Sequence, residues 1–338
     1  MATDKYLTAS QKAVDCLVKT GICRPDFRKE HTDAAFYFKS VTSLLLAGKH
    51  KEANNVLDHI RDTCMKDDDF ISPGVEVGQK SANGAYNEFW AYANGWIAMG
   101  AMRLQRFDVA YPAYRYIQEK FFHPALGGAT LKPYSKTEPN IVEVLSTAHL
   151  GMVFMTFGDL DKALKCGENL KLFTKLNKEG DPNTFYLRMD DKEKLVTDFP
   201  AEAAAICAVK STEANQLYFF VGYPIAFLAK LYAATGNESF RNCAEDILDF
   251  CMRCDESIYS FNFSHKVGWG AACLAAAVSN TDKKEKYIQV ATKIADYLVS
   301  LQSDRGSFLD SSPEMDNLDQ TAEISVWLRE IATELDRA

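Results

Sequence analysis

Residues 144–160 read VLSTAHLGMVFMTFGDL, an apolar run without charge that ends in a short polar turn. A charged amphipathic stretch follows it. The same order occurs five times along the chain, at turns that begin at Gly48, Gln105, Gly158, Gly236 and Asn280. These turns lie about 57, 53, 78 and 44 residues apart, and periods of this length are typical of stacked helical hairpins.

The two arms of each hairpin carry their polar residues differently. The leading arms without charge include residues 144–157, 217–229 and 267–278, and such an arm is typical of a helix buried on all sides. The following arms place apolar residues on one face only. With a first helix near residues 9–20, about twelve helices form six pairs. We therefore expect a single-domain (α/α)6 toroid over residues 1–338, with the leading arms in the inner ring.

The inner helices are predicted at residues 33–47, 87–104, 140–157, 214–235, 265–279 and 319–335. Pro224 should kink the fourth of them or mark a local break. Residues 184–199 alternate in polarity around the turn Asp190-Asp191-Lys192-Glu193, which indicates a small inserted β-hairpin. The hairpin is either a lid over a pocket or a plain surface hairpin.

Composition narrows the classes of partner and cofactor. The net charge is −8, and Lys and Arg alternate with acidic residues, so we expect no nucleic-acid partner. No segment reaches about eighteen apolar residues and no signal peptide is evident, which favours a cytoplasmic protein without a membrane span. Phosphate-binding loops, nucleophile elbows and HExxH motifs are missing. We expect a small-molecule substrate and no metal or nucleotide cofactor.

The nine cysteines are odd in number and lie mostly within helix patterns, which indicates reduced thiols. Cys251 and Cys254 have a CxxC spacing. No second pair or nearby histidine completes a zinc site, so we expect both to be structural.

Strict alternation of inner and outer helices brings the N-terminal ends of the inner helices to one mouth, where a small molecule can bind. The predicted catalytic residues are Glu88, Glu143, His265 and Asp319. The predicted substrate-binding residues are Tyr37, Tyr86, Asn87, Trp90, Tyr218, Phe219, Phe261, Phe263, Trp269 and Glu323. His265 follows an aromatic run and is the best acid–base candidate among the histidines.

Several of these residues also have a structural interpretation. Asp319 falls at a predicted helix start, as do Asp33 and Asn140, where a polar side chain caps backbone N–H groups. For Glu88 and Glu143 the catalytic and capping interpretations are equally open. His149 is interpreted as a core histidine, and the run Asp67-Asp68-Asp69 as a solvated loop.

Residues 293–308, KIADYLVSLQSDRGSF, resemble the Gln–Trp repeat of terpenoid cyclases and the related prenyltransferase toroids, with Phe308 in place of the usual Trp. The segment Asp319-Gln320-Thr321-Ala322 is similar to the Asp-x-Thr-Ala start of the next helix in that superfamily. The resemblance implies a toroid fold. The Asp-x-Asp-Asp acid motif and the zinc ligands of those enzymes are absent, so neither activity is carried over.

A second resemblance lies at residues 92–100, YANGWIAMG. The Asn94-Gly95-Trp96 segment is similar to one in six-hairpin glycosidases that act on unsaturated uronides, although Tyr92 and Ala93 stand where the catalytic Asp is expected. Sugar epimerases that share the toroid use two histidines, and His265 could serve as one.

Three functions are compatible with these patterns. The leading hypothesis is a cofactor-independent cyclase, isomerase or lyase that acts on a mainly apolar small molecule in an aromatic-lined cavity. The alternative is a carbohydrate-active enzyme, either a sugar epimerase or a six-hairpin glycoside hydrolase. The third is a non-catalytic helical scaffold.

Overall fold

A computed structural model describes residues 3–82, 84 and 90–338. The predicted site residues Tyr86, Asn87 and Glu88 lie outside the described residues. Two compact units are present, residues 7–121 with 301–329 (the 7–121 unit) and residues 122–300 with 1–6 and 330–338 (the 122–300 unit). Each unit is described by itself, and the single-domain organisation stays a prediction.

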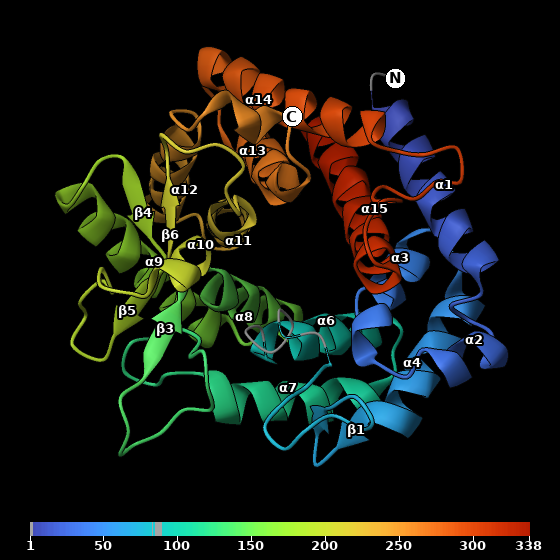
Figure 1. Cartoon of the computed structure of the whole chain (residues 1–338). Helices are drawn as coiled ribbons and strands as arrows, with labels where there is room; N and C mark the ends of the chain where they lie inside the picture. The colour runs from blue at the N-terminus through green and yellow to red at the C-terminus, as the bar shows by residue number, and fades with distance from the viewer. Residues whose placement is uncertain (1–2, 83, 85–89) are drawn as a thin grey trace. The chain divides into compact units, whose positions relative to one another are not determined.

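The described residues of the 7–121 unit form helices and one short antiparallel strand pair (Figure 1). Its helices are most of α1 (Asp4–Thr20), α2 (Pro25–Glu30), η1 (Ala34–Phe36), α3 (Ser40–Leu46), α4 (His50–Cys64), α6 (Trp90–Arg103), α7 (Phe107–Phe121) and most of α15 (Glu314–Arg337). Strands β1 (Met65–Lys66) and β2 (Asp69–Phe70) follow α4. Helices α3 and α4 pack together, as do α6 and α7.

The 122–300 unit continues the series of helical pairs. Its helices are α8 (Val144–Thr156), α9 (Leu160–Glu179), η2 (Ala201–Ala203), α10 (Ala204–Cys207), α11 (Phe219–Thr235), α12 (Glu238–Cys251), η3 (Glu256–Tyr259), η4 (Asn262–Ser264), α13 (His265–Ala277) and α14 (Thr281–Ser300). Its strands are β3 (Ile141–Glu143), β4 (Thr184–Tyr186), β5 (Arg188–Asp190) and β6 (Ala208–Lys210).

The predicted turns between paired arms are confirmed, and their sequence explains the helix ends. Asp159 caps α9 by accepting from the Lys162 backbone N–H, and the Asn237 side chain caps α12 through Ser239. Gly236 ends α11 in the left-handed region, with φ at 70°, where glycine has no Cβ penalty. Each leading arm can therefore stop abruptly and its partner can begin within two or three residues.

Helices α11 and α13 approach each other closely, and Figure 1 draws them side by side. A Cβ on Gly222 would lie 2.3 Å from the Val267 backbone nitrogen, and one on Gly270 would lie 2.9 Å from the Gly222 carbonyl oxygen. The two glycines let the backbones meet without side chains between them. Both helices are buried almost all round, as the charge-free stretches 217–229 and 267–278 predict.

The predicted hairpin is present at its turn, where Met189 forms an antiparallel bridge with Leu195 and the Asp190 N–H donates to the Lys194 carbonyl at 3.0 Å. Its first arm is divided between two small sheets. Strand β4 pairs with β6, and β5 pairs with β3. A role as a lid stays a prediction.

Four predicted helix starts are displaced. Residues 33–47 divide into η1 and α3, α8 begins at Val144 after strand β3, and α11 begins at Phe219 and continues through Pro224 without a break. Helix α15 begins five residues early, because the Pro313 carbonyl accepts from the Asn317 N–H at 2.9 Å and proline suits a helix start. In the described part of the chain, no helix combines the length and apolar character needed to cross a membrane.

Candidate active site

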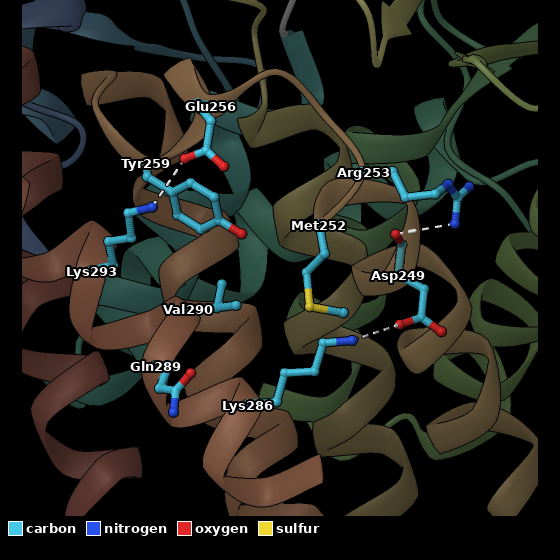
Figure 2. Close-up of a pocket in the computed structure, with 9 residues that line it drawn as sticks. All are labelled: Asp249, Met252, Arg253, Glu256, Tyr259, Lys286, Gln289, Val290 and Lys293. Atoms are coloured by element: carbon cyan, nitrogen blue, oxygen red, sulfur yellow. Dashed lines mark hydrogen bonds and ion pairs between the residues drawn. The ribbon is translucent and has the colours of Figure 1, made fainter. Parts of the chain in front are cut away.

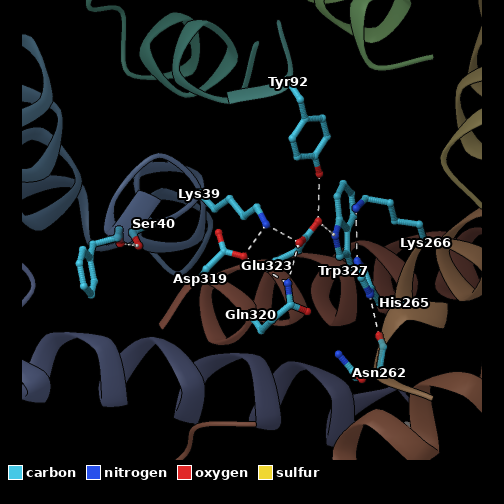
Figure 3. Close-up of polar contacts among 11 residues, drawn as sticks. Lys39, Ser40, Tyr92, Asn262, His265, Lys266, Asp319, Gln320, Glu323 and Trp327 are labelled. Atoms are coloured by element: carbon cyan, nitrogen blue, oxygen red, sulfur yellow. Dashed lines mark hydrogen bonds and ion pairs between the residues drawn. The ribbon is translucent and has the colours of Figure 1, made fainter. Parts of the chain in front are cut away.

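A buried ionic cluster lies in the 7–121 unit (Figure 3). Helix α15 presents Asp319 and Glu323 one turn apart, and Lys39 directly precedes α3. The Lys39 Nζ atom lies 2.7 Å from Asp319 Oδ2 and 2.5 Å from Glu323 Oε2. The exposed fraction is 5% for Lys39, 3% for Asp319 and 2% for Glu323. Since one ammonium touches both carboxyl groups, the two acids lie within reach of a single small ligand.

The Glu323 carboxylate is saturated with hydrogen bonds. Tyr92 donates its hydroxyl to Oε1 at 3.0 Å and Trp327 donates its indole N–H to the same atom at 3.2 Å. Lys39 and the Gln320 amide donate to Oε2. Among the described residues, four donors therefore fix the orientation of this carboxylate.

Asp319 is different because one of its oxygens has no partner. Its Oδ2 accepts from Lys39 and, at 3.2 Å, from Gln320, while Oδ1 is buried without a hydrogen bond. The Oε1 atom of Gln320 is likewise buried and unpaired. Buried polar atoms normally have a hydrogen-bond partner, so these two oxygens mark a place where an O–H group of a ligand or of water can donate.

The surroundings of the cluster raise the pKa of both Asp319 and Lys39. Burial raises the pKa of Asp319, Lys39 opposes this effect and Glu323 adds to it, so that the pKa lies above its usual range. Burial disfavours the Lys39 ammonium, but Asp319 and Glu323 outweigh it and its pKa is raised. Asp319 can therefore hold a proton under conditions where the neighbouring cation stays charged.

In the 122–300 unit, His265 and Lys266 form a second buried pair at the start of α13. The His265 Nδ1 atom lies 2.7 Å from the Asn262 carbonyl, which can only accept, so Nδ1 carries the proton. The Nε2 atom lies 3.3 Å from Lys266 Nζ and accepts from it. His265 is thus a neutral imidazole whose second nitrogen faces a cation.

Three aromatic rings predicted to bind substrate lie near this pair. Phe219 lies 4.8 Å from the Lys266 ammonium and packs edge-on against Phe263, which in turn meets Phe261 at 5.3 Å between centroids. The ring of Phe219 also stacks 6.4 Å from that of His265. The structure therefore brings Phe219, Phe261, Phe263 and His265 together.

Other predicted site residues have structural partners. Tyr37 is fully buried and donates its hydroxyl to the His31 carbonyl. Tyr218 contacts the Ser257 hydroxyl at 3.1 Å, and Trp269 packs edge-on against Tyr223. Trp90 donates its indole N–H to Asp69 at 3.0 Å. These contacts hold the core together, and a role in binding substrate stays a prediction for each of them.

Glu143 serves as the N-cap of α8, where its carboxylate accepts from the Leu145 and Ser146 N–H groups at 2.6 and 2.7 Å. Burial raises its pKa, but both oxygens are occupied, so we leave Glu143 out of the proposed site. Asp33 caps η1, as expected. The predicted capping role of Asp319 is wrong because α15 begins at Glu314.

The interpretation of Asp67–Asp69 as a solvated loop is wrong for Asp69, which is buried. Lys80 lies 2.7 Å from its Oδ1, and Tyr116 donates to Oδ2 at 2.9 Å. Asn94 donates to the same carboxylate at 2.9 Å. Burial lowers the pKa of Lys80 to about 8, against the effect of Asp69. This network fastens the 65–81 segment to α6 and α7, and sequence spacing gave no sign of it.

Sequence reasoning also missed Lys39 and Tyr92. The only signal for Lys39 is that it is the one charged residue in the apolar stretch 34–46. The described residues contain no group of three or more His, Cys, Asp or Glu side chains suited to a metal ion. Burial raises the pKa of the Cys254 thiol to about 12, which makes this thiol unreactive near neutral pH.

A surface groove of about 560 Å³ lies between α12, η3 and α14 (Figure 2). Lys293 caps the Tyr259 ring at 3.9 Å and pairs with Glu256 at 3.1 Å. Lys286 pairs with Asp249 at 4.0 Å. The charged side chains of these two pairs thus contact one another across the groove.

No protein-family model matches the chain, and no curated protein is significantly similar in sequence. Solved structures with the same architecture do exist. D-mannose isomerase superposes with a TM-score of 0.62 at 10% identity, over 89% of this chain and 86% of that one. The GH76 α-1,6-mannanase of a Salegentibacter species has a TM-score of 0.62 at 11% identity, over 98% of this chain and 99% of that one. Unsaturated glucuronyl hydrolase of a Bacillus species has a TM-score of 0.60 at 11% identity, over 97% of this chain and 96% of that one.

The chain has the α/α toroid fold. The predicted fold class is confirmed, whereas membership of the terpenoid cyclase superfamily is not supported, because the similar structures are other toroids. The leading functional hypothesis, a cyclase, isomerase or lyase for an apolar molecule, is overturned because the similar structures are carbohydrate enzymes. The ionic, hydrogen-bonded character of the Lys39 cluster agrees with this correction.

Proposed function

We propose that the protein is a carbohydrate-active enzyme that moves a proton on a sugar, as an isomerase or epimerase, with Asp319 as the acid–base group. The observation that carries the proposal is the unpaired Oδ1 of Asp319 beside the fully bonded Glu323. The fold supports it, because D-mannose isomerase shares the toroid.

The arrangement suits proton transfer. Sugar isomerisation requires a group that removes a proton from the carbon beside the carbonyl, exchanges it with solvent and then delivers a proton to a neighbouring atom. Burial raises the pKa of the Asp319 carboxyl above its usual value, and raised carboxyl pKa values are typical of acid–base groups in active sites. Lys39 and Gln320 fix its other oxygen, so that Oδ1 is the atom left to exchange the proton.

Glycoside hydrolysis is the second candidate, because the GH76 mannanase and the glucuronyl hydrolase share the fold. A covalent mechanism needs a carboxylate nucleophile beside the acid. Glu323 would have to give up several of its four hydrogen bonds to attack a sugar carbon. Hydrolysis with Asp319 as general acid is the form of this alternative that fits the cluster.

His265 is a further proposed acid–base residue, in the 122–300 unit. Its Nε2 has to release Lys266 before it can take a proton. Phe219, Phe261 and Phe263 offer aromatic faces on which a sugar ring can stack.

The test is an assay of aldoses, ketoses and α-mannosides with product analysis by NMR. We expect interconversion of free hexoses, and a fall in turnover of about 10²–10⁴ in Asp319→Asn, which keeps the size of the side chain but cannot transfer the proton. The matched control is Asp316→Asn, two turns from Glu323 on the same helix. Absence of turnover on every sugar, or full activity of a folded Asp319→Asn variant, would refute the proposal.

A further inference from the structure

The hydrogen-bonding groups still unpaired in the Lys39 cluster bear on the charge of its ligand. Among the described residues of the cluster, the buried atoms without a partner are Asp319 Oδ1 and Gln320 Oε1. Both are oxygens. Gln320 places its amide nitrogen on two carboxylates, at 3.2 and 3.3 Å, so the reverse orientation of the amide would set oxygen against oxygen. The assignment of Oε1 as the unpaired atom is therefore fixed by its neighbours.

An amide oxygen can only accept a hydrogen bond, and a carboxyl oxygen accepts when ionised. The matching ligand group is a hydroxyl, which donates to either oxygen and can also accept from a protonated Asp319. A polyhydroxylated molecule can donate a hydroxyl to each of these two oxygens.

The charges of the cluster act against an anion. Lys39 is the ammonium of the cluster, and Asp319 and Glu323 already occupy it at 2.7 and 2.5 Å. Among the residues that the structure describes, the cluster thus has two carboxyl groups for one cation before any ligand arrives. A ligand carboxylate or phosphate placed here would lie beside two acids in a poorly hydrated environment, where like charges repel strongly.

We propose that the Asp319 site selects neutral sugars and excludes uronic acids and sugar phosphates. The inference rests on the proposed function and narrows its substrate class. Among the sugars named for the similar structures, it favours neutral mannose-type substrates over glucuronides. The selectivity comes from Asp319 and Gln320, because their unpaired oxygens accept a hydrogen bond from a sugar hydroxyl but have no N–H to donate to an anion.

The experiment is titration calorimetry of the full chain with glucose and mannose, each paired with its uronic acid and its 6-phosphate. We expect each neutral sugar to bind at least about tenfold more tightly than its two charged partners. In Asp319→Asn, the neutral sugars should weaken and the ratio between neutral sugar and uronic acid should fall toward one, because the variant removes an acid and introduces an N–H donor. Thermal melting of the same samples confirms that the variant is folded.

A second variant keeps the test open where Asp319→Asn fails to fold. Gln320→Leu removes the unpaired acceptor but no charge, so it should weaken neutral sugars while uronic acids remain excluded. Equal or tighter binding of a uronic acid by the wild-type protein overturns the selectivity, while the proposed function survives. If none of the sugars binds, the proposed function fails and the selectivity fails with it.

Discussion

Replacing Lys39 with methionine tests the electrostatics of the candidate site. Methionine is close in length and fills the same space, so the loss reports the ammonium rather than a cavity. Two buried carboxyl groups then lose their shared cation and two charge-assisted hydrogen bonds, at 2.7 and 2.5 Å. Removal of one partner from a buried ion pair typically costs about 3–5 kcal/mol, and we expect a loss in this range at pH 8.

The matched control is Lys293→Met. Lys293 pairs with Glu256 at 3.1 Å, but the two side chains are 56% and 85% exposed. An exposed pair contributes about 1 kcal/mol or less, so this variant should be nearly as stable as the wild type. Urea unfolding monitored by circular dichroism measures both. Equal losses for the two variants would show that the Lys39 cluster is not a buried charge network.

The loss in Lys39→Met should also depend on pH. Without the ammonium, the raised pKa of the Asp319 carboxyl rises further. A carboxyl with a raised folded-state pKa supports stability below its unfolded pKa and loses that support as pH rises through the folded value. The deficit relative to wild type should therefore shrink between pH 8 and pH 5. A deficit that grows on acidification contradicts this assignment.

Three further predictions concern the fold and the second acid–base residue. Gly222→Ala should lower stability by several kcal/mol, about 3 or more, because its Cβ meets backbone at 2.3 Å, whereas Gly180→Ala, with nothing closer than 3.6 Å, should change it by about 0.5 kcal/mol or less. Leu228→Ala should cost about 2–5 kcal/mol and Lys286→Ala under about 0.5, and similar shifts in urea midpoint would count against the buried position of α11. His265→Gln should lower turnover by about 10²–10⁴ with the melting curve intact, and a well-folded variant with normal turnover removes His265 from the site.

Much of the fold could be predicted from the sequence because helix burial leaves a local record. A charge-free arm such as α8 and an amphipathic partner such as α9 differ within the single stretch of residues 144–179. The turns between them are marked by glycine and capping residues. These signals depend on neighbours within four or five positions, which a single sequence displays directly.

The site could be predicted only in part, because its contacts join distant residues. The separation in sequence between Lys39 and its partners is 280 and 284 residues, and no local pattern encodes such a pairing. Asp319 and Glu323 were found because they fall near the predicted start of the last inner helix, but the role of Asp319 was obscured by an error of five residues in the start of α15. Asp69 was missed because its partners come from α6 and α7.

The most direct test of the account is the exchange of sugar hydrogen with solvent. Neutral hexoses are incubated with the protein in D2O, and deuterium at the carbon beside the carbonyl is measured by NMR. Proton transfer through Asp319 predicts deuterium incorporation by the wild-type protein and its loss in folded Asp319→Asn. Incorporation that persists in the variant, or isomerisation without any deuterium in the product, contradicts the proposal.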